Sequence, residues 1–335
     1  MMRLPLFRYH LPQTLAEAVR ILDGEGPEAR LIAGGTDLLP NMKRRQLSPS
    51  VLIGLRQVQK LREGSLRGNN SLSLGACLTI SDIVRNEQVR TRFGALWQAA
   101  SQIATPLIRN MGTLGGNLCL DTRCNYYNQS YEWRKAINFC LKKEGTICWV
   151  ATGSAHCLAV SSTDTAPALM ALGARVRLLS CKGEREIPLS SFYRNDGVDY
   201  LTRRHDEILT EVLLDAEEGW RSTYWKLRRR GSFDFPVLSV AASAKISGGV
   251  VQAVRLVLGS VSSCPLRAPE AEAFLLGRFL DDAAIQEAAT IAARASKPLD
   301  NTDFDMTWRK KAGREFVVNA LCELRGDDMR DRRNI

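Results

Sequence analysis

Nine cysteines are present in this chain, and four of them lie close together in the sequence. Cys124, Cys140, Cys148 and Cys157 share one short stretch, where an even spread along the chain would place about one. Thiolates bind iron–sulfur clusters and zinc, so four of them near each other form a candidate metal site. The spacing C-x15-C-x7-C-x8-C has neither the C-x2-C pairs of many structural zinc sites nor the compact ferredoxin run. The residues alone leave an iron–sulfur cluster, a zinc ion and unliganded thiols open.

The stretch around these cysteines, residues 121–160, differs in character from the rest of the chain. It is aromatic, basic and irregular, which predicts an inserted loop. Basic side chains there could offset the negative charge of a cluster held by four thiolates. His156 adjoins Cys157, but beside a full set of four cysteines it is expected to be a neighbour and not a ligand. The basic residues are Arg123, Arg134, Lys135, Lys142 and Lys143, and the aromatic ones are Tyr126, Tyr127, Trp133, Phe139 and Trp149.

Two glycine-rich turns precede this stretch. One is Ile32-Ala33-Gly34-Gly35-Thr36-Asp37, and the other is Gly112-Thr113-Leu114-Gly115-Gly116-Asn117. Because glycine has no Cβ, such turns let backbone N–H groups approach a phosphate closely. Neither turn has the G-x-G-x-x-G of a Rossmann fold or the Gly-Lys-Ser/Thr of a P-loop. Each alone could be a plain tight turn, but the pair predicts a diphosphate gripped from two sides in another kind of nucleotide-binding fold.

The first turn is expected to join a short strand to a helix. An earlier helix has Thr14 as its N-cap and is predicted to end at Gly24. A strand over 30–33 follows, and a helix over 37–43 begins directly after the glycines. The second turn comes after a helix predicted over 94–104.

The second half of the chain carries clear strand and helix patterns. Asp164 could cap a helix over 168–172. Gly248 and Gly249 separate two apolar runs, 237–246 and 250–258, which predicts a β-hairpin. A strand is predicted over 175–179, and helices are predicted over 267–276, 281–295 and 307–324.

The composition is that of an ordinary globular protein with more than one domain. The chain has 335 residues, of which 45% are hydrophobic and 24% charged, and this length exceeds what one core usually supports. No apolar run approaches the roughly 20 residues of a membrane helix, and the N-terminal residues do not resemble a signal peptide. A cytoplasmic protein with reduced thiols and no membrane contact is therefore expected.

The charge pattern narrows the classes of partner. A net charge of +10 suits an acidic protein or an anionic cofactor. Nucleic-acid binding is not expected, because the one dense basic run, 226–230, lacks interleaved aromatic residues and no known module is present. With three histidines in the chain, no acid–base catalyst is predicted. The other cysteines, Cys77, Cys119, Cys181, Cys264 and Cys322, are expected to be small apolar fillers.

Several separated motifs together resemble those of a known family, along nearly the whole chain. The family is that of the flavin-binding subunits of the molybdenum hydroxylases, the xanthine oxidase group. The similar segments are Ile32 to Pro40, Arg109 to Asn117, Asp164 to Leu169, Lys226 to Asp234, and Pro265-Leu266-Arg267-Ala268 with Glu270 and Glu272.

The cysteine-rich stretch narrows this resemblance, because most such subunits lack it. Residues 121–130 and 139–143 resemble the β subunits of 4-hydroxybenzoyl-CoA reductases. In those subunits the insert binds an additional [4Fe–4S] cluster, and the resemblance extends to all four cysteines.

The resemblance implies an α+β fold with two kinds of domain. An FAD-binding fold of the vanillyl-alcohol-oxidase (PCMH) type in two subdomains would cover 1–57 and 58–215, with the cluster loop at about 121–160. A C-terminal α+β domain of the CO-dehydrogenase flavoprotein type would cover 216–326, followed by a charged tail, 327–335.

The resemblance also implies roles for particular residues. Asp164 would approach the polar chain of the flavin, and Lys226 would lie near the isoalloxazine, where a cation stabilises the anionic reduced form. The two walls around the FAD diphosphate would be Ile32, Ala33, Gly34, Gly35, Thr36, Asp37 and Leu38 on one side, and Thr113, Leu114, Gly115, Gly116 and Asn117 on the other. The ligands of the [4Fe–4S] cluster would be Cys124, Cys140, Cys148 and Cys157.

The implied role is electron transfer, with the substrate chemistry on another chain. An acidic ferredoxin would supply electrons, and the partners would be a large molybdopterin subunit and a small [2Fe–2S] subunit in a dimer of heterotrimers. The reaction would be the reductive dehydroxylation of 4-hydroxybenzoyl-CoA in anaerobic aromatic degradation. Two alternatives are the flavin subunit of a molybdenum hydroxylase for an aldehyde, a purine or another acyl-CoA, and a zinc protein that binds nucleic acid.

Overall fold

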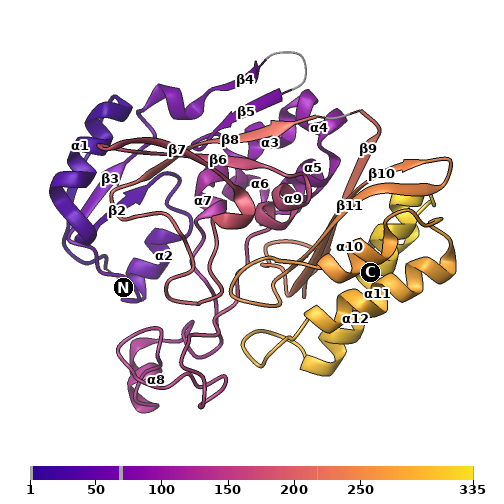
Figure 1. Ribbon diagram of the computed structural model, residues 1–335. Coiled ribbons are helices and arrows are strands. Elements are labelled where there is room, and N and C mark those ends of the chain that lie inside the picture. Colours follow the sequence, from indigo (N-terminus) through magenta and orange to yellow (C-terminus); the bar gives the residue numbers. More distant parts are fainter. Residues whose placement is uncertain (1–2, 68–70, 217, 335) are drawn as a thin grey trace.

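The computed structural model describes residues 3–67, 71–216 and 218–334. Three β-sheets, each with helices packed on it, follow one another along the chain (Figure 1). The predicted α+β class, with an FAD-binding part and a C-terminal part of the CO-dehydrogenase flavoprotein type, is confirmed. Among the described residues, no helix is both long and apolar enough to span a membrane.

The N-terminal sheet is small and entirely parallel, in the order β1-β3-β2. Helix α1 packs its apolar stripe on this sheet, and Thr14 caps it by accepting a hydrogen bond from the Glu17 N–H at 3.1 Å. The helix ends at Glu25, and the residue after it, Gly26, is its C-cap with a φ of +68° that suits glycine, so the predicted end at Gly24 is wrong. Its elements are β1 Arg8–His10, α1 Leu15–Glu25, β2 Ala29–Ile32, α2 Leu38–Lys43 and β3 Val51–Gly54.

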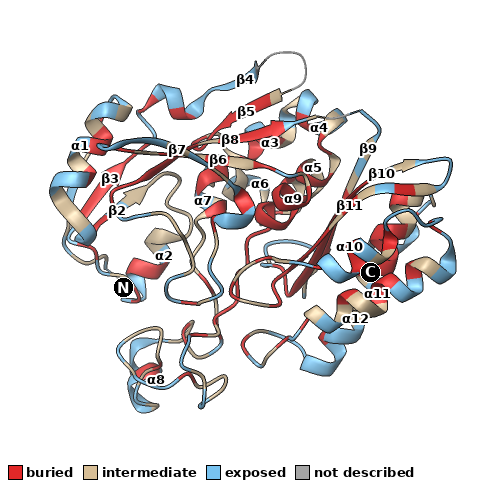
Figure 2. Ribbon diagram, viewed as in Figure 1, coloured by how far each residue is buried: buried red, intermediate tan, exposed pale blue. Residues whose placement is uncertain are grey.

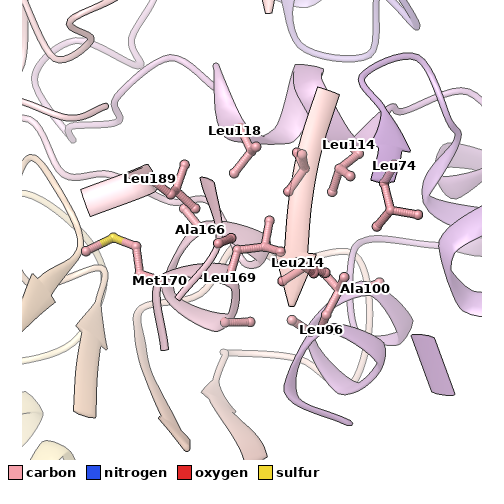
Figure 3. Packing of buried hydrophobic residues seen from close by; sticks show 14 of the residues in the cluster. Leu74, Leu96, Ala100, Leu114, Leu118, Ala166, Leu169, Met170, Leu189 and Leu214 are labelled. Carbon is pink, nitrogen blue, oxygen red and sulfur yellow. The ribbon is translucent and has the colours of Figure 1, made fainter. Parts of the chain in front are cut away.

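The middle sheet is antiparallel, in the order β4-β5-β8-β6-β7, and it carries the largest core. Figure 3 shows side chains from helices and strands of this part meeting in one apolar cluster, with Leu114 and Leu118 from one helix and Ala166 and Leu169 from another. Its strands are β4 Gly64–Arg67, β5 Ser71–Gly75, β6 Arg175–Ser180, β7 Gly183–Pro188 and β8 Ile208–Asp215. Its helices are α3 Ile80–Arg85, α4 Glu87–Arg92, α5 Gly94–Ser101, α6 Pro106–Arg109, α7 Leu114–Leu118 and α9 Thr165–Ala171.

The cysteine-rich stretch between α7 and α9 forms a separate lobe, called here the cysteine insert, residues 121–160. It lies below the main body in Figure 1 and consists mostly of turns around one short helix, α8 Tyr131–Ala136. Its irregular character therefore agrees with the sequence prediction of an inserted loop.

The C-terminal sheet is antiparallel, in the order β12-β11-β10-β9, and β10 and β11 are buried along much of their length (Figure 2). One face packs on the middle core through Ala241 and Val257, and the other packs on three helices. The predicted hairpin at Gly248 and Gly249 is confirmed, and both glycines have positive φ. The elements are β9 Trp220–Leu227, β10 Leu238–Ser247, β11 Val250–Gly259, β12 Leu266–Arg267, α10 Pro269–Leu275, α11 Asp282–Ala295 and α12 Met306–Arg325.

Candidate flavin and iron–sulfur sites

A cavity of 640 Å³ opens between the N-terminal sheet, the middle domain and the cysteine insert. Most residues predicted for the flavin site line it. Leu114 is buried in the core below its turn, and Lys226 lies behind Asp164 with its side chain fully enclosed. The predicted residues that line the cavity are Ile32, Ala33, Gly34, Gly35, Thr36, Asp37, Leu38, Thr113, Gly115, Gly116, Asn117 and Asp164.

The first glycine turn leads from β2 into α2 along the wall of this cavity. Gly35 has a φ of +71°, a conformation that side-chain-bearing residues rarely adopt. Among the described residues, the backbone N–H groups of residues 34–38 donate no hydrogen bond. Five free donors on a concave, glycine-lined surface suit the oxygens of a diphosphate.

The two glycine turns pack directly against each other. A Cβ on Gly34 would lie 1.8 Å from the carbonyl oxygen of Met111, the residue before the second turn. Glycine at this position therefore lets the two walls meet at the cavity.

The second turn is tied to the start of α9. The Thr113 hydroxyl accepts a hydrogen bond from the Gly116 N–H at 3.1 Å. The side-chain oxygen of Asn117 accepts bonds from the hydroxyls of Thr163 and Thr165, at 2.8 and 2.6 Å, and from the Thr165 N–H at 3.1 Å. Asn117 thereby fixes the two residues on either side of Asp164.

Asp164 belongs to a buried charged group at the cavity wall. It takes the N-cap position of α9 but makes no capping bond, so the capping role considered for it is wrong. Its carboxylate accepts a hydrogen bond from the Tyr224 hydroxyl at 2.7 Å and forms an ion pair with Lys226 at 3.0 Å. Burial raises the pKa of Asp164, and the charge of Lys226 opposes that shift. Burial lowers the pKa of Lys226, and Asp164 opposes that shift in turn.

Two residues at this cavity, Phe233 and Ala104, were not among the predicted site residues. Phe233 lines it, and its backbone N–H donates to the carbonyl of Ala104 at 3.1 Å. Both residues have positive φ, +72° for Phe233 and +42° for Ala104. Such backbone strain in residues other than glycine is often found at functional sites, but side-chain type does not reveal it.

The four clustered cysteines are all buried and line one small space in the cysteine insert. Tyr126, Tyr127 and Trp149 help to enclose it. Burial is the main cause that raises the pKa of Cys124 to about 12 and that of Cys157 to about 11. Outside the insert, Cys181 is exposed and is therefore not the apolar filler that the sequence suggested.

The same insert holds a buried cation. Arg134 on α8 is 1% exposed, and all three nitrogens of its guanidinium lack a hydrogen-bond partner among the described residues. Its backbone carbonyl accepts from the N–H of Phe139, the residue before Cys140, and its guanidinium lies over the Phe139 ring. An uncompensated buried cation is costly, so this arrangement favours an anion nearby.

The donor chemistry of the insert therefore fits an anionic iron–sulfur cluster, whose irons each take one thiolate. The space that the cysteines enclose is 10 Å³, so binding a cluster requires their side chains to move apart. In the described part of the chain, no group of three or more His, Cys, Asp or Glu side chains is set for a single metal ion.

The insert is attached to the first glycine turn. Arg123 forms an ion pair with Asp37, and the Asp121 N–H approaches the same carboxylate at 3.4 Å. Burial raises the pKa of Asp37, and the charge of Arg123 opposes the shift. Tyr127 and Lys142 line both the large cavity and the space between the cysteines. The two candidate sites thus share a wall.

Two sequence families match the two parts of this chain. Residues 5–214 match the FAD binding domain in molybdopterin dehydrogenase, and residues 222–324 match the CO dehydrogenase flavoprotein C-terminal domain. The carbon monoxide dehydrogenase medium chain of Hydrogenophaga pseudoflava is 28% identical over 319 residues, 95% of this chain and 96% of its own. The aldehyde oxidoreductase FAD-binding subunit PaoB of Escherichia coli K12 is 32% identical over 283 residues, 80% and 86% of the two chains.

Solved structures agree with these matches. The carbon monoxide dehydrogenase of H. pseudoflava that lacks the Mo-pyranopterin moiety of its cofactor superposes with a TM-score of 0.80 at 28% identity. That alignment covers 96% of this chain and 98% of the other. The reconstituted CO dehydrogenase of Oligotropha carboxidovorans shares the fold, with a TM-score of 0.81 at 24% identity over 98% and 100% of the chains.

The fold and the match to the FAD binding domain identify this chain as an FAD-binding flavoprotein. The chain belongs to the molybdenum hydroxylase family, as an FAD-binding subunit of an oxidoreductase.

Proposed function

We propose that this chain is the FAD and [4Fe–4S] subunit of a 4-hydroxybenzoyl-CoA reductase. It would carry electrons from an acidic ferredoxin toward a small [2Fe–2S] subunit and a large molybdopterin subunit, where the substrate loses its phenolic hydroxyl. The observation that supports this most directly is the insert with four buried cysteines, which shares a wall with the flavin cavity.

The residues of this chain support a role as an electron carrier and not as the subunit that converts the substrate. Bound FAD would exchange single electrons and electron pairs between its neighbours. The free N–H groups of residues 34–38 would bind its diphosphate, and Asp164 with Lys226 would hold fixed charges at the cavity wall. Arg134 would compensate the negative charge of a cluster on the four cysteines.

An alternative is a flavin subunit without a cluster, in a molybdenum hydroxylase for another substrate. Relatives named for carbon monoxide, xanthine and aldehydes are consistent with this alternative. It does not account for four cysteines gathered in one buried space or for the unpaired Arg134.

Iron and flavin content separate the two proposals. The complex purified without oxygen should lose about four irons per protomer in Cys148→Ser and keep its FAD. Cys181→Ser removes an exposed cysteine outside the insert and should keep both. An unchanged iron content in Cys148→Ser, with no zinc present, would show that these cysteines do not bind a cluster and would leave the alternative.

A further inference from the structure

Lys142 is the charged side chain at the wall between the two candidate sites. It lies two residues after Cys140 and lines both the flavin cavity and the space between the cysteines. Its side chain is 6% exposed. A charge that is buried to this degree acts over a longer range than a surface charge, because water screens it little.

Three acceptors hold the ammonium group of Lys142 in place. It donates to Asp121 Oδ1 at 2.8 Å, to the Thr122 hydroxyl at 2.6 Å and to the carbonyl of Gly197 at 2.6 Å. All three N–H donors of an ammonium are thereby used. Lys142 can act on a bound cofactor through its charge, without a direct hydrogen bond.

Gly197 connects this ammonium to the thiols. Its N–H donates to the carbonyl of Cys157 at 2.8 Å, and a Cβ on Gly197 would lie 2.6 Å from the Cys157 sulfur. One backbone unit therefore separates the ammonium from a candidate cluster ligand.

Two aromatic rings on the side of the flavin cavity also contact the ammonium group of Lys142. The Lys142 nitrogen lies 4.9 Å from the ring centre of Tyr127 and 5.6 Å from that of Tyr200. Both rings line the large cavity. The electron-rich faces of these rings favour a cation between them and fix its position further.

We propose that the charge of Lys142 acts on both cofactors. It favours the reduced form of a cluster on the four cysteines and the reduced form of the flavin beside it. This inference rests on the proposed [4Fe–4S] function. Each centre gains negative charge when it takes up an electron, so a fixed cation nearby raises the reduction potential of both. Asp121 faces the flavin cavity and limits the effect on that side.

Potentiometric titration of the purified complex tests this role. The reduced cluster is followed by electron paramagnetic resonance, and the flavin by its absorbance. In Lys142→Met, both midpoint potentials should shift to more negative values, and the cluster should shift further. Lys142→Arg keeps the charge and should restore most of the wild-type values. Lys135→Met removes an exposed charge of the same insert and should leave both potentials unchanged.

The outcomes separate this inference from the function on which it rests. Four irons present in Lys142→Met with unshifted potentials would overturn it, as would an equal shift in Lys135→Met. If Lys142→Met loses iron, the cause could be the carboxylate of Asp121, which has lost its partner. The double variant Asp121→Asn/Lys142→Met removes that charge as well. Loss of iron there too would assign Lys142 a structural role and overturn the proposal. A wild-type complex without any signal from a four-iron cluster would instead refute the proposed function, and this inference with it.

Discussion

At the scale of single residues, Gly34 shows how a missing side chain builds the flavin site. It is the point where the two glycine turns touch, and the nearest obstacle to a Cβ is the backbone of Met111, which cannot rotate away. The close approach brings two walls of backbone around one cavity. Gly34 is therefore important for the packing of the two turns and not for a polar contact.

We expect Gly34→Ala to weaken FAD binding and to destabilise the protein by about 1–3 kcal/mol, the usual cost of overpacking. The reason is the 1.8 Å approach of the new Cβ to the Met111 carbonyl oxygen. FAD retained after gel filtration, together with the denaturant midpoint, measures both effects.

Gly24→Ala is the matched control, because Gly24 lies in helix α1 with open space around its Cβ position. The control should keep FAD and gain roughly 0.5–1 kcal/mol. Equal FAD retention in the two variants would contradict this role of Gly34.

The sequence predicted the segments that line the cavity but not the pairs of side chains within its wall. Glycine and cysteine can be identified from type and spacing, so both turns and the four cysteines could be predicted. The pairing of Asp164 with Lys226, and of Lys142 with Asp121 and Gly197, joins residues far apart in the chain. Such pairs depend on tertiary packing, which no local pattern encodes. The roles assigned to Lys226 and to the cysteines stay predictions until they are measured.

At the scale of elements, Glu207 joins two strands of the middle sheet. It lies directly before β8, and its buried carboxylate accepts hydrogen bonds from Arg185 on β7 at 2.6 and 2.9 Å. The Arg204 N–H donates to it at 2.7 Å. Burial alone would raise the pKa of Glu207, but these hydrogen bonds and charges outweigh it and lower the pKa below its ordinary value of 4.5. Glu207 therefore stabilises the fold as an anion.

This arrangement gives a stability that depends on pH. Because the folded-state pKa of Glu207 is lowered, its contribution is fully present above about pH 4.5 and is lost as the pH falls through the folded-state value. We expect Glu207→Gln to lower the free energy of unfolding by about 1–3 kcal/mol at pH 7 and to flatten its decline in acid. Urea unfolding at several pH values measures both. Glu184→Gln removes a half-exposed partner of Arg177 and should change the stability by less than about 1 kcal/mol. An unaltered acid profile in Glu207→Gln would rule out this role.

Elements with local signals were predicted, and those that need distant partners were missed. The helices predicted over 281–295 and 307–324 occur as Asp282–Ala295 and Met306–Arg325, because their apolar periodicity is local. Strand β5 pairs with β8, which lies far along the chain, and neither strand was predicted. The helix end at Gly24 was wrong because a glycine inside a helix and one that ends it look alike in sequence.

At the scale of the whole molecule, the cysteine insert is a lobe with exposed apolar side chains and an exposed basic residue. This lobe projects below the main body in Figure 1 and exposes Tyr131, Trp133 and Ile147. Lys135 is exposed on the same helix as the first two, in a chain whose net charge is +10. Exposed apolar side chains and an exposed lysine on this lobe suit an acidic protein donor.

If an acidic ferredoxin docks on this lobe, electron delivery should depend on salt. Raising the ionic strength from about 0.02 M to about 0.5 M should slow the second-order reduction of the complex by about tenfold or more, because screening removes the steering attraction. Lys135→Glu should slow the reaction at low salt and have little effect at high salt. Lys310→Glu places the same charge change on α12, outside the insert, and should retain most of the wild-type rate. Stopped-flow absorbance under nitrogen follows the reaction. A rate that is independent of salt, or equal losses in the two variants, would refute docking on the insert and point to another face of the complex.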